Sequence, residues 1–225
     1  MGNNLKTISL SITSVALTLL INTAALGAPV NIEYEGAGTS TSLDIKNAPS
    51  INAGLNTITV DGNSSLALNT SNNSMTATWT ATANSYVDVQ AGAGQYNHGS
   101  KGEEKYSKAG YLFSLLDISE SLSTTAAKYN ALVNYVIWDI LGNPPKLGNS
   151  DDRDAADSLE ALAKDNKAFD WSTTMVVYTA NDGSAREFFT VLPPIATPIP
   201  SALFLFGSMA LGLFGIVTRK QATSA

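Results

Sequence analysis

The chain has 225 residues, 44% of them hydrophobic and 14% charged, with one histidine, His98, and no cysteine. Without cysteine it cannot form disulfides, iron–sulfur clusters, zinc-thiolate sites or a thiol nucleophile, and one histidine cannot build a metal site rich in imidazole. Residues 28–200 carry 10 basic and 19 acidic side chains, a net charge of about −9, which should repel nucleic acid.

The first 27 residues have the three parts of a secretory signal peptide. Lys6 supplies a positive charge, an apolar run covers residues 8–21, and small side chains precede a cleavage site expected between Gly27 and Ala28. We therefore expect the mature chain to leave the cytoplasm. The alternative is an uncleaved membrane anchor, which the hydroxyl side chains within the apolar run disfavour.

Residues from Val30 to about Gln90 alternate apolar and polar side chains and predict antiparallel strands. Asp61-Gly62 suits the positive backbone dihedral angles of a tight hairpin turn, so the segments on either side of it should pair. The strand pattern occurs in four segments, 57–60, 65–68, 75–82 and 85–89.

The spacing of apolar residues changes to that of a helix after a glycine-rich loop at 92–102, whose histidine is assigned no role. A first helix should end near Asp117. A second should run to Leu141, with the hydroxyl of Thr124 or Thr125 capping its start. Its expected core positions are Tyr129, Leu132, Val133, Val136, Ile137 and Ile140.

A third helix is expected to begin with Asp151 or Asp152 as its cap and to end near Asn166. Closely spaced carboxylates in this region could bind calcium, but the segment lacks the glycine and the alternating ligands of a calcium loop. Acidic residues at a helix start are also favoured by the helix dipole alone. The carboxylates concerned are Asp151, Asp152, Asp154, Asp157 and Glu160.

Two closing strands, 174–179 and 186–191, flank a turn at Asn181-Asp182-Gly183. The order of strands, three helices and strands predicts an α+β fold for residues 28–192. We expect an antiparallel sheet, as a sandwich or a barrel, with an inserted segment of three helices.

The carboxyl-terminal part of the chain predicts a tether, a membrane helix and a basic tail. Four prolines within 193–200 prevent helix formation and strand pairing. Residues 201–217 contain no charge and as a helix would span roughly 25 Å, enough for a short transmembrane segment. Arg219 and Lys220, in the tail 218–225, favour the cytoplasmic side, so the body should face outward. A buried helix of a globular core is the alternative, although it should show a polar face.

Residues 197–220 resemble the PEP-CTERM sorting signal of Gram-negative bacteria that make exopolysaccharide. That signal combines a Pro-x-Pro motif, here Pro198-Ile199-Pro200, with an apolar helix and a basic stop. Its middle position is often glutamate, where this chain has isoleucine. The resemblance implies processing by an exosortase, a membrane protease or transpeptidase, and transient residence in the inner membrane. The anchor residues that carry the match are Leu203, Phe204, Leu205, Phe206, Gly207, Ser208, Gly212, Leu213 and Gly215.

Residues 106–113, 131–140 and 186–191 resemble PEP-CTERM body domains related to bacterial thioester-type adhesion domains. In those relatives a glutamine four residues before a tryptophan is crosslinked to a cysteine. Here Asn134 precedes Trp138 and the chain has no cysteine, so that chemistry is impossible. We expect Trp138 to be a core residue. The resemblance then implies a fold and no activity.

These patterns together predict a non-enzymatic, exported protein of the cell surface or extracellular matrix, released by an exosortase and associated with exopolysaccharide in a biofilm. No catalytic constellation, metal site or cofactor is expected. Two alternatives remain open. One is a secreted carbohydrate-active hydrolase that uses two acidic residues. The other is a surface binding protein that keeps its membrane anchor permanently.

Overall fold

Six strands form one antiparallel sheet that closes into a barrel, in the order β1-β2-β3-β6-β5-β4. The computed structural model describes residues 29–72, 76–97, 101–118, 122–142 and 144–192. These residues combine the sheet with four helices, which confirms the predicted α+β class and antiparallel pairing. The strands are β1 (Pro29–Leu43), β2 (Ile51–Val60), β3 (Asn63–Asn69), β4 (Thr78–Asn84), β5 (Met175–Ala180) and β6 (Phe188–Val191).

The hairpin between β2 and β3 turns at Asp61-Gly62, as predicted. Both residues have positive φ angles, 47° and 85°, which match the twist of the flanking strands. The Oδ1 atom of Asp61 also accepts a hydrogen bond of 2.9 Å from the backbone N–H of Asn31 in β1. The turn therefore joins three neighbouring strands.

The barrel interior is filled by a cluster with members from all six strands. β3, β4 and β5 contribute alanines to it, and the rings of Trp79 and Phe188 stack with centroids 5.6 Å apart. A six-stranded barrel is narrow, so alanines beside two large rings fill it. The alanines of this cluster are Ala67, Ala81, Ala83, Ala180 and Ala185.

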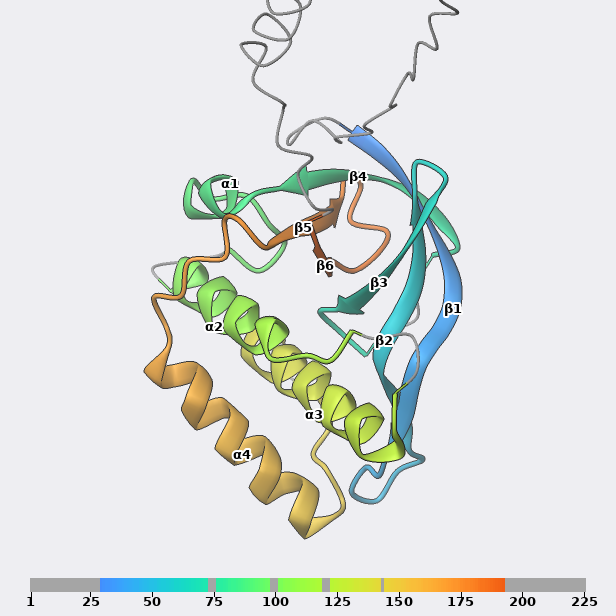
Figure 1. Ribbon diagram of the computed structural model, residues 1–225, viewed down its shortest axis with the longest axis vertical. Coiled ribbons are helices and arrows are strands. Elements are labelled where there is room, and N and C mark those ends of the chain that lie inside the picture. The colour runs from blue at the N-terminus through green and yellow to red at the C-terminus, as the bar shows by residue number, and fades with distance from the viewer. Residues whose placement is uncertain (1–28, 73–75, 98–100, 119–121, 143, 193–225) are drawn as a thin grey trace, which may run out of the picture. The chain divides into compact units, whose positions relative to one another are not determined.

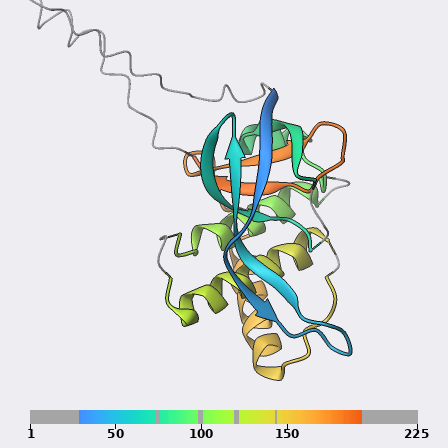
Figure 2. The same ribbon diagram turned by 90° about the vertical axis from the view of Figure 1, so that its right-hand side faces the viewer.

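A second and larger core lies between the sheet and the helices. Figure 1 shows α2, α3 and α4 gathered on one side of the sheet. In Figure 2 the lower parts of β1 and β2 lie against these helices, and α3 contacts both strands. The helices are α1 (Tyr86–Gln90), α2 (Gly102–Ser114), α3 (Thr124–Leu141) and α4 (Ser150–Asp165).

β6 connects the two cores through two adjacent aromatic residues. Phe188 points into the barrel cluster, whereas Phe189 belongs to the helix-side core. The ring of Phe189 lies 5.8 Å from that of Phe113 and 6.1 Å from that of Trp171, measured between centroids. Because neighbouring residues of a strand face opposite sides, these two residues of β6 contribute to different cores.

The prediction of a strand at 85–89 is wrong. Ser85 caps α1: its hydroxyl accepts from the N–H of Asp88 and the Asp88 carboxylate accepts from the N–H of Ser85. This reciprocal capping box starts a helix despite the alternating pattern of Tyr86 to Val89.

The predicted helix caps are wrong by one to three residues. Ser123, rather than Thr124 or Thr125, caps α3 by accepting from the N–H of Ala126 at 3.2 Å. Asn149, rather than Asp151 or Asp152, caps α4, and its Oδ1 accepts from both of those backbone N–H groups. Serine and asparagine cap as well as the predicted residues do, so residue type alone does not choose among close neighbours.

The closing hairpin pairs as predicted, with Tyr178 opposite Phe188. Its connection covers residues 181–187, however, and is longer than a turn at Asn181-Asp182-Gly183 alone. The predicted membrane helix at 201–217 lies outside the described residues. Within the described part of the chain, no helix has the length and apolar character needed to cross a membrane.

Candidate functional site

The residues that the sequence predicts for sorting all lie outside the described part of the chain, so the structure brings none of them together. They are Gly27 and Ala28 at the signal cleavage site, Pro198, Ile199 and Pro200 in the sorting motif, the anchor residues between 203 and 215, and Arg219 and Lys220. His98 lies outside it as well. The candidate sites below therefore belong to the folded body.

A buried polar site centres on Glu187, immediately before β6. Its side chain has no solvent exposure. The Oε1 atom accepts hydrogen bonds of 2.6 Å from the backbone N–H of Gln95 and 2.6 Å from the Thr179 hydroxyl. The hydroxyl of Tyr106 in α2 donates to Oε2. A carboxyl group in the core thus joins a loop, a helix and β5.

Burial is the main influence on both titratable groups of this site. It raises the pKa of Glu187, and the hydrogen bonds from Thr179, Tyr106 and Gln95 offset part of the rise. Burial also raises the pKa of Tyr106, and the adjacent Glu187 raises it further. Among the described residues no cation forms an ion pair with Glu187.

The segment 91–97 is shaped to reach this carboxyl group. Gly94 has a φ of +103°, and a Cβ atom there would lie 2.5 Å from the hydroxyl oxygen of Tyr106. The same oxygen accepts from the backbone N–H of Tyr96 at 3.1 Å. The side chain of Gln95 donates to the carbonyl of Ala185 at 3.1 Å. Only glycine combines this close approach with a left-handed backbone.

A second group of buried polar side chains occupies one face of α3, four residues apart. Trp138 donates from Nε1 to the backbone oxygen of Asn69 at 3.0 Å and to its side-chain oxygen at 2.8 Å. Asn134 donates to the carbonyl of Gly54 in β2 at 3.1 Å, and Asn130 donates to that of Asp117 at 2.7 Å. Trp138 is 2% exposed and is a core residue, as predicted. The side chains of Asn130, Asn134 and Trp138 therefore attach α3 to β2, to Asn69 in β3 and to the segment that contains Asp117.

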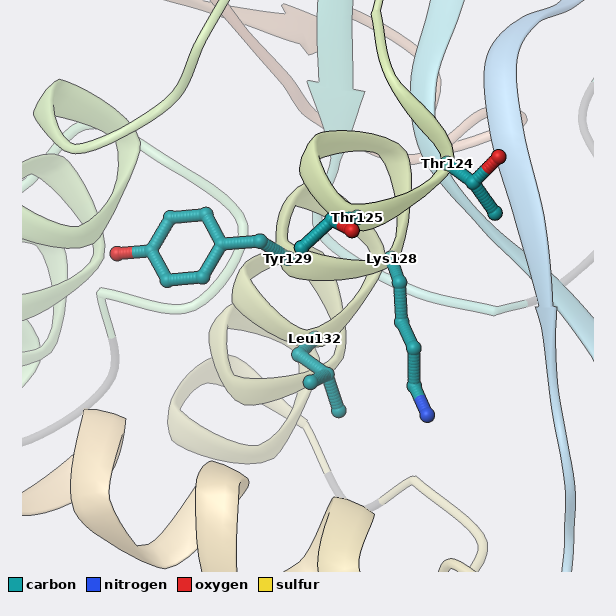
Figure 3. Close-up of a pocket in the computed structure, with 5 residues that line it drawn as sticks. All are labelled: Thr124, Thr125, Lys128, Tyr129 and Leu132. Atoms are coloured by element: carbon teal, nitrogen blue, oxygen red, sulfur yellow. The ribbon is translucent and has the colours of Figure 1, made fainter.

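A surface hollow of about 310 Å³ lies along the first turns of α3 (Figure 3). Its lining combines two hydroxyls, the ring of Tyr129 and the stem of Lys128. The Lys128 ammonium is already paired with Asp152 at 2.7 Å, and this partner raises the lysine pKa. With its only charge neutralised from α4, the hollow has no free ionic group to select a ligand. The lining residues are Thr124, Thr125, Lys128, Tyr129 and Leu132.

The acidic segment of α4 does not gather into a metal site. Asp152 is buried against Lys128, whereas Asp151 and Asp154 are exposed. In the described ranges no three His, Asp or Glu side chains lie close enough to hold a metal ion. Burial raises the pKa of Asp139 in α3, and the nearby charges of Glu160 and Asp157 raise it further. The carboxylates here repel one another.

Comparison of the chain with known protein families, with curated proteins and with solved structures finds no match. The assignment of a function therefore depends on the residues themselves.

The site at Glu187 was not among the residues predicted from the sequence, although one pattern indicated it. Residues two apart on a strand share a face, so Glu187 had to share the face of Phe189. A carboxyl group beside an aromatic core residue indicates a buried acid that needs hydrogen-bond donors. The loop and helix residues that supply those donors, Gln95 and Tyr106, are 92 and 81 positions away in the chain, and their spacing gives no sign of the contact.

Proposed function

We propose that this chain is a non-catalytic, exported protein of the cell surface or extracellular matrix, sorted by an exosortase through its carboxyl-terminal signal. The order of parts in residues 197–220 carries the proposal: Pro198-Ile199-Pro200, then an uncharged apolar segment, then Arg219-Lys220. An anchored helix behind an extended, accessible proline segment is the arrangement that a membrane-embedded protease requires.

The limits of the folded body are consistent with removal of both ends. The first strand begins at Pro29, just after the expected signal cleavage site, and the last ends at Val191, just before the prolines. All described residues fall within one compact unit, Ala24–Ile195. Cleavage in the tether would therefore remove none of the described helices and strands.

The chemistry of the body supports a binding or structural role over catalysis. Its one fully buried carboxyl group, among the described residues, is enclosed by donors and cannot meet a substrate in this conformation. Its net charge of about −9 disfavours acidic polymers, so a neutral stretch of exopolysaccharide is the expected matrix component.

Mass spectrometry of the full chain, expressed with and without an active exosortase, tests the proposal. We expect peptides from 201–225 to disappear only in the strain with the enzyme. The double variant P198A/P200A should keep these peptides in both strains, whereas the matched control P193A/P194A should be processed normally. Recovery of the intact tail from the exosortase-containing strain would overturn the proposal and favour a permanently anchored protein.

A further inference from the structure

We propose that Glu187 is a proton-controlled latch, which holds the segment 91–97 against the barrel while its carboxyl group is neutral and releases the segment when the proton leaves. This property is independent of how the chain is sorted. It rests on the position of one acid among neutral donors that belong to three separate parts of the fold.

The closed arrangement accommodates a neutral acid without losing its central contacts. The hydroxyl of Tyr106 donates to Oε2; with a proton on Oε2 this hydrogen bond would reverse, so that the carboxyl group donates to the Tyr106 hydroxyl oxygen. Oε1 still accepts from the Gln95 N–H and from the Thr179 hydroxyl. A side-chain amide of Asn84 donates to Thr179 at 2.8 Å and keeps that hydroxyl directed at the acid.

When Glu187 is charged, no described cation pairs with it to offset its loss of hydration. The loop contributes Gln95, α2 contributes Tyr106 and β5 contributes Thr179, so among the described residues Tyr106 is the titratable side chain that contacts the acid. Neither Arg186, next to it in sequence, nor any other described cation is paired with it. Neutral donors only partly replace the hydration of a carboxylate, and burial therefore raises the pKa of Glu187.

Of the elements around the acid, the segment 91–97 is the one that can yield. Phe188 and Phe189 fix the strand that follows Glu187 in two cores, and Tyr106 is fully buried. The segment has neither helix nor strand. Hydrogen bonds to Glu187, Ala185 and Tyr106 attach it to the barrel and to α2, and bonds to Val89 and Asp88 attach it to α1. Loss of the proton should thus open the loop and leave the barrel intact.

Amide hydrogen exchange of the purified full chain tests the latch, with the N–H of Gln95 as the reporter. After correction for intrinsic exchange, its protection should fall about tenfold per pH unit between the pKa of Glu187 in the open form and its higher pKa in the closed form, because in this range opening is coupled to release of one proton. E187Q reproduces the neutral acid, since its amide donates to Tyr106 while its oxygen accepts from Gln95. Its protection should not change with pH.

A second pair of variants tests the latch if E187Q folds poorly. T179V removes a donor that favours the carboxylate and so raises the closed-form pKa of Glu187; the fall in Gln95 protection should then continue to a higher pH, while the pH at which it begins stays the same. T179S keeps the hydroxyl and should behave like the unaltered chain. Protection of Gln95 that is constant with pH in the unaltered chain, or that falls in parallel in E187Q, would overturn the proposal.

Discussion

Gly110 in α2 lies directly against the indole ring of Trp171, with no room between them for a side chain. A Cβ atom at this position would lie 2.7 Å from Nε1 and 2.8 Å from Cγ of the ring. Trp171 is fully buried and packs edge-on against Tyr86 and Phe189. The glycine therefore sets how closely α2 approaches the segment that precedes β5.

Replacing Gly110 with alanine should destabilise the protein by about 1–3 kcal/mol, because the methyl group overpacks the core. In an ordinary helix the same change stabilises by up to about 1 kcal/mol, so the sign of the effect is the test. Urea unfolding measures it. In a W171L background the smaller side chain leaves room, and most of the cost should disappear. An equal cost in both backgrounds would contradict the steric explanation.

Trp138 and Trp79 offer a matched pair for measuring the buried hydrogen bonds of α3. Both are nearly buried, at 2% and 5% exposed, but Trp138 Nε1 donates to Asn69 whereas Trp79 Nε1 has no partner among the described residues. We expect W138F to lower the free energy of unfolding by about 1–3 kcal/mol more than W79F, because it removes the buried hydrogen bonds from Nε1 to Asn69. Similar losses in thermal unfolding would refute a special role for this bond.

The turn residue Gly62 tests backbone strain without steric interference. Its φ is +85°, and no atom would approach an added Cβ within 4 Å. G62A should therefore cost about 1–2 kcal/mol from the left-handed backbone alone. G62N should cost much less, because asparagine tolerates this conformation. Denaturant midpoints of the two variants give the comparison, and equal costs would show that the turn relaxes.

Asp139 gives a prediction about pH. Its pKa is raised by burial and by the charges of Glu160 and Asp157, above the usual value of 3.8. The folded protein then binds the proton more tightly than the unfolded chain, so the Asp139 contribution to stability declines as the pH rises through this range. D139N should stabilise the protein at neutral pH by a few tenths of a kcal/mol, since the site is largely solvated.

This gain should vanish at pH values below 3.8, where the carboxyl group is protonated in both states. D151N is the matched control, because Asp151 lies in the first turn of α4, where the helix dipole favours a negative charge. It should lose stability slightly at neutral pH. A gain in D151N equal to that in D139N would indicate a general effect of net charge.

Local patterns of the sequence predicted most of the elements, and the failures have physical causes. Asp61-Gly62 and the apolar spacing of α3 located the turn and the helix because turn chemistry and helical periodicity act over a few residues, although Tyr129, an expected core position of α3, is exposed. The segment 85–89 was misassigned because one capping interaction outweighs a short alternation. Closure of the barrel depends on the pairing of β1 with β4 and of β3 with β6, which are distant in sequence. No local pattern encodes that choice.

The position of β6 in the sheet determines when the barrel can close during the export that we propose. This last strand of the described body is inserted between β3 and β5, and its two phenylalanines complete both hydrophobic cores. A chain that extends only as far as Ala185 lacks β6. It would leave a gap between β3 and β5 and both hydrophobic cores incomplete. Closure of the barrel therefore requires the chain as far as Val191, which lies about ten residues before the apolar segment at 201–217.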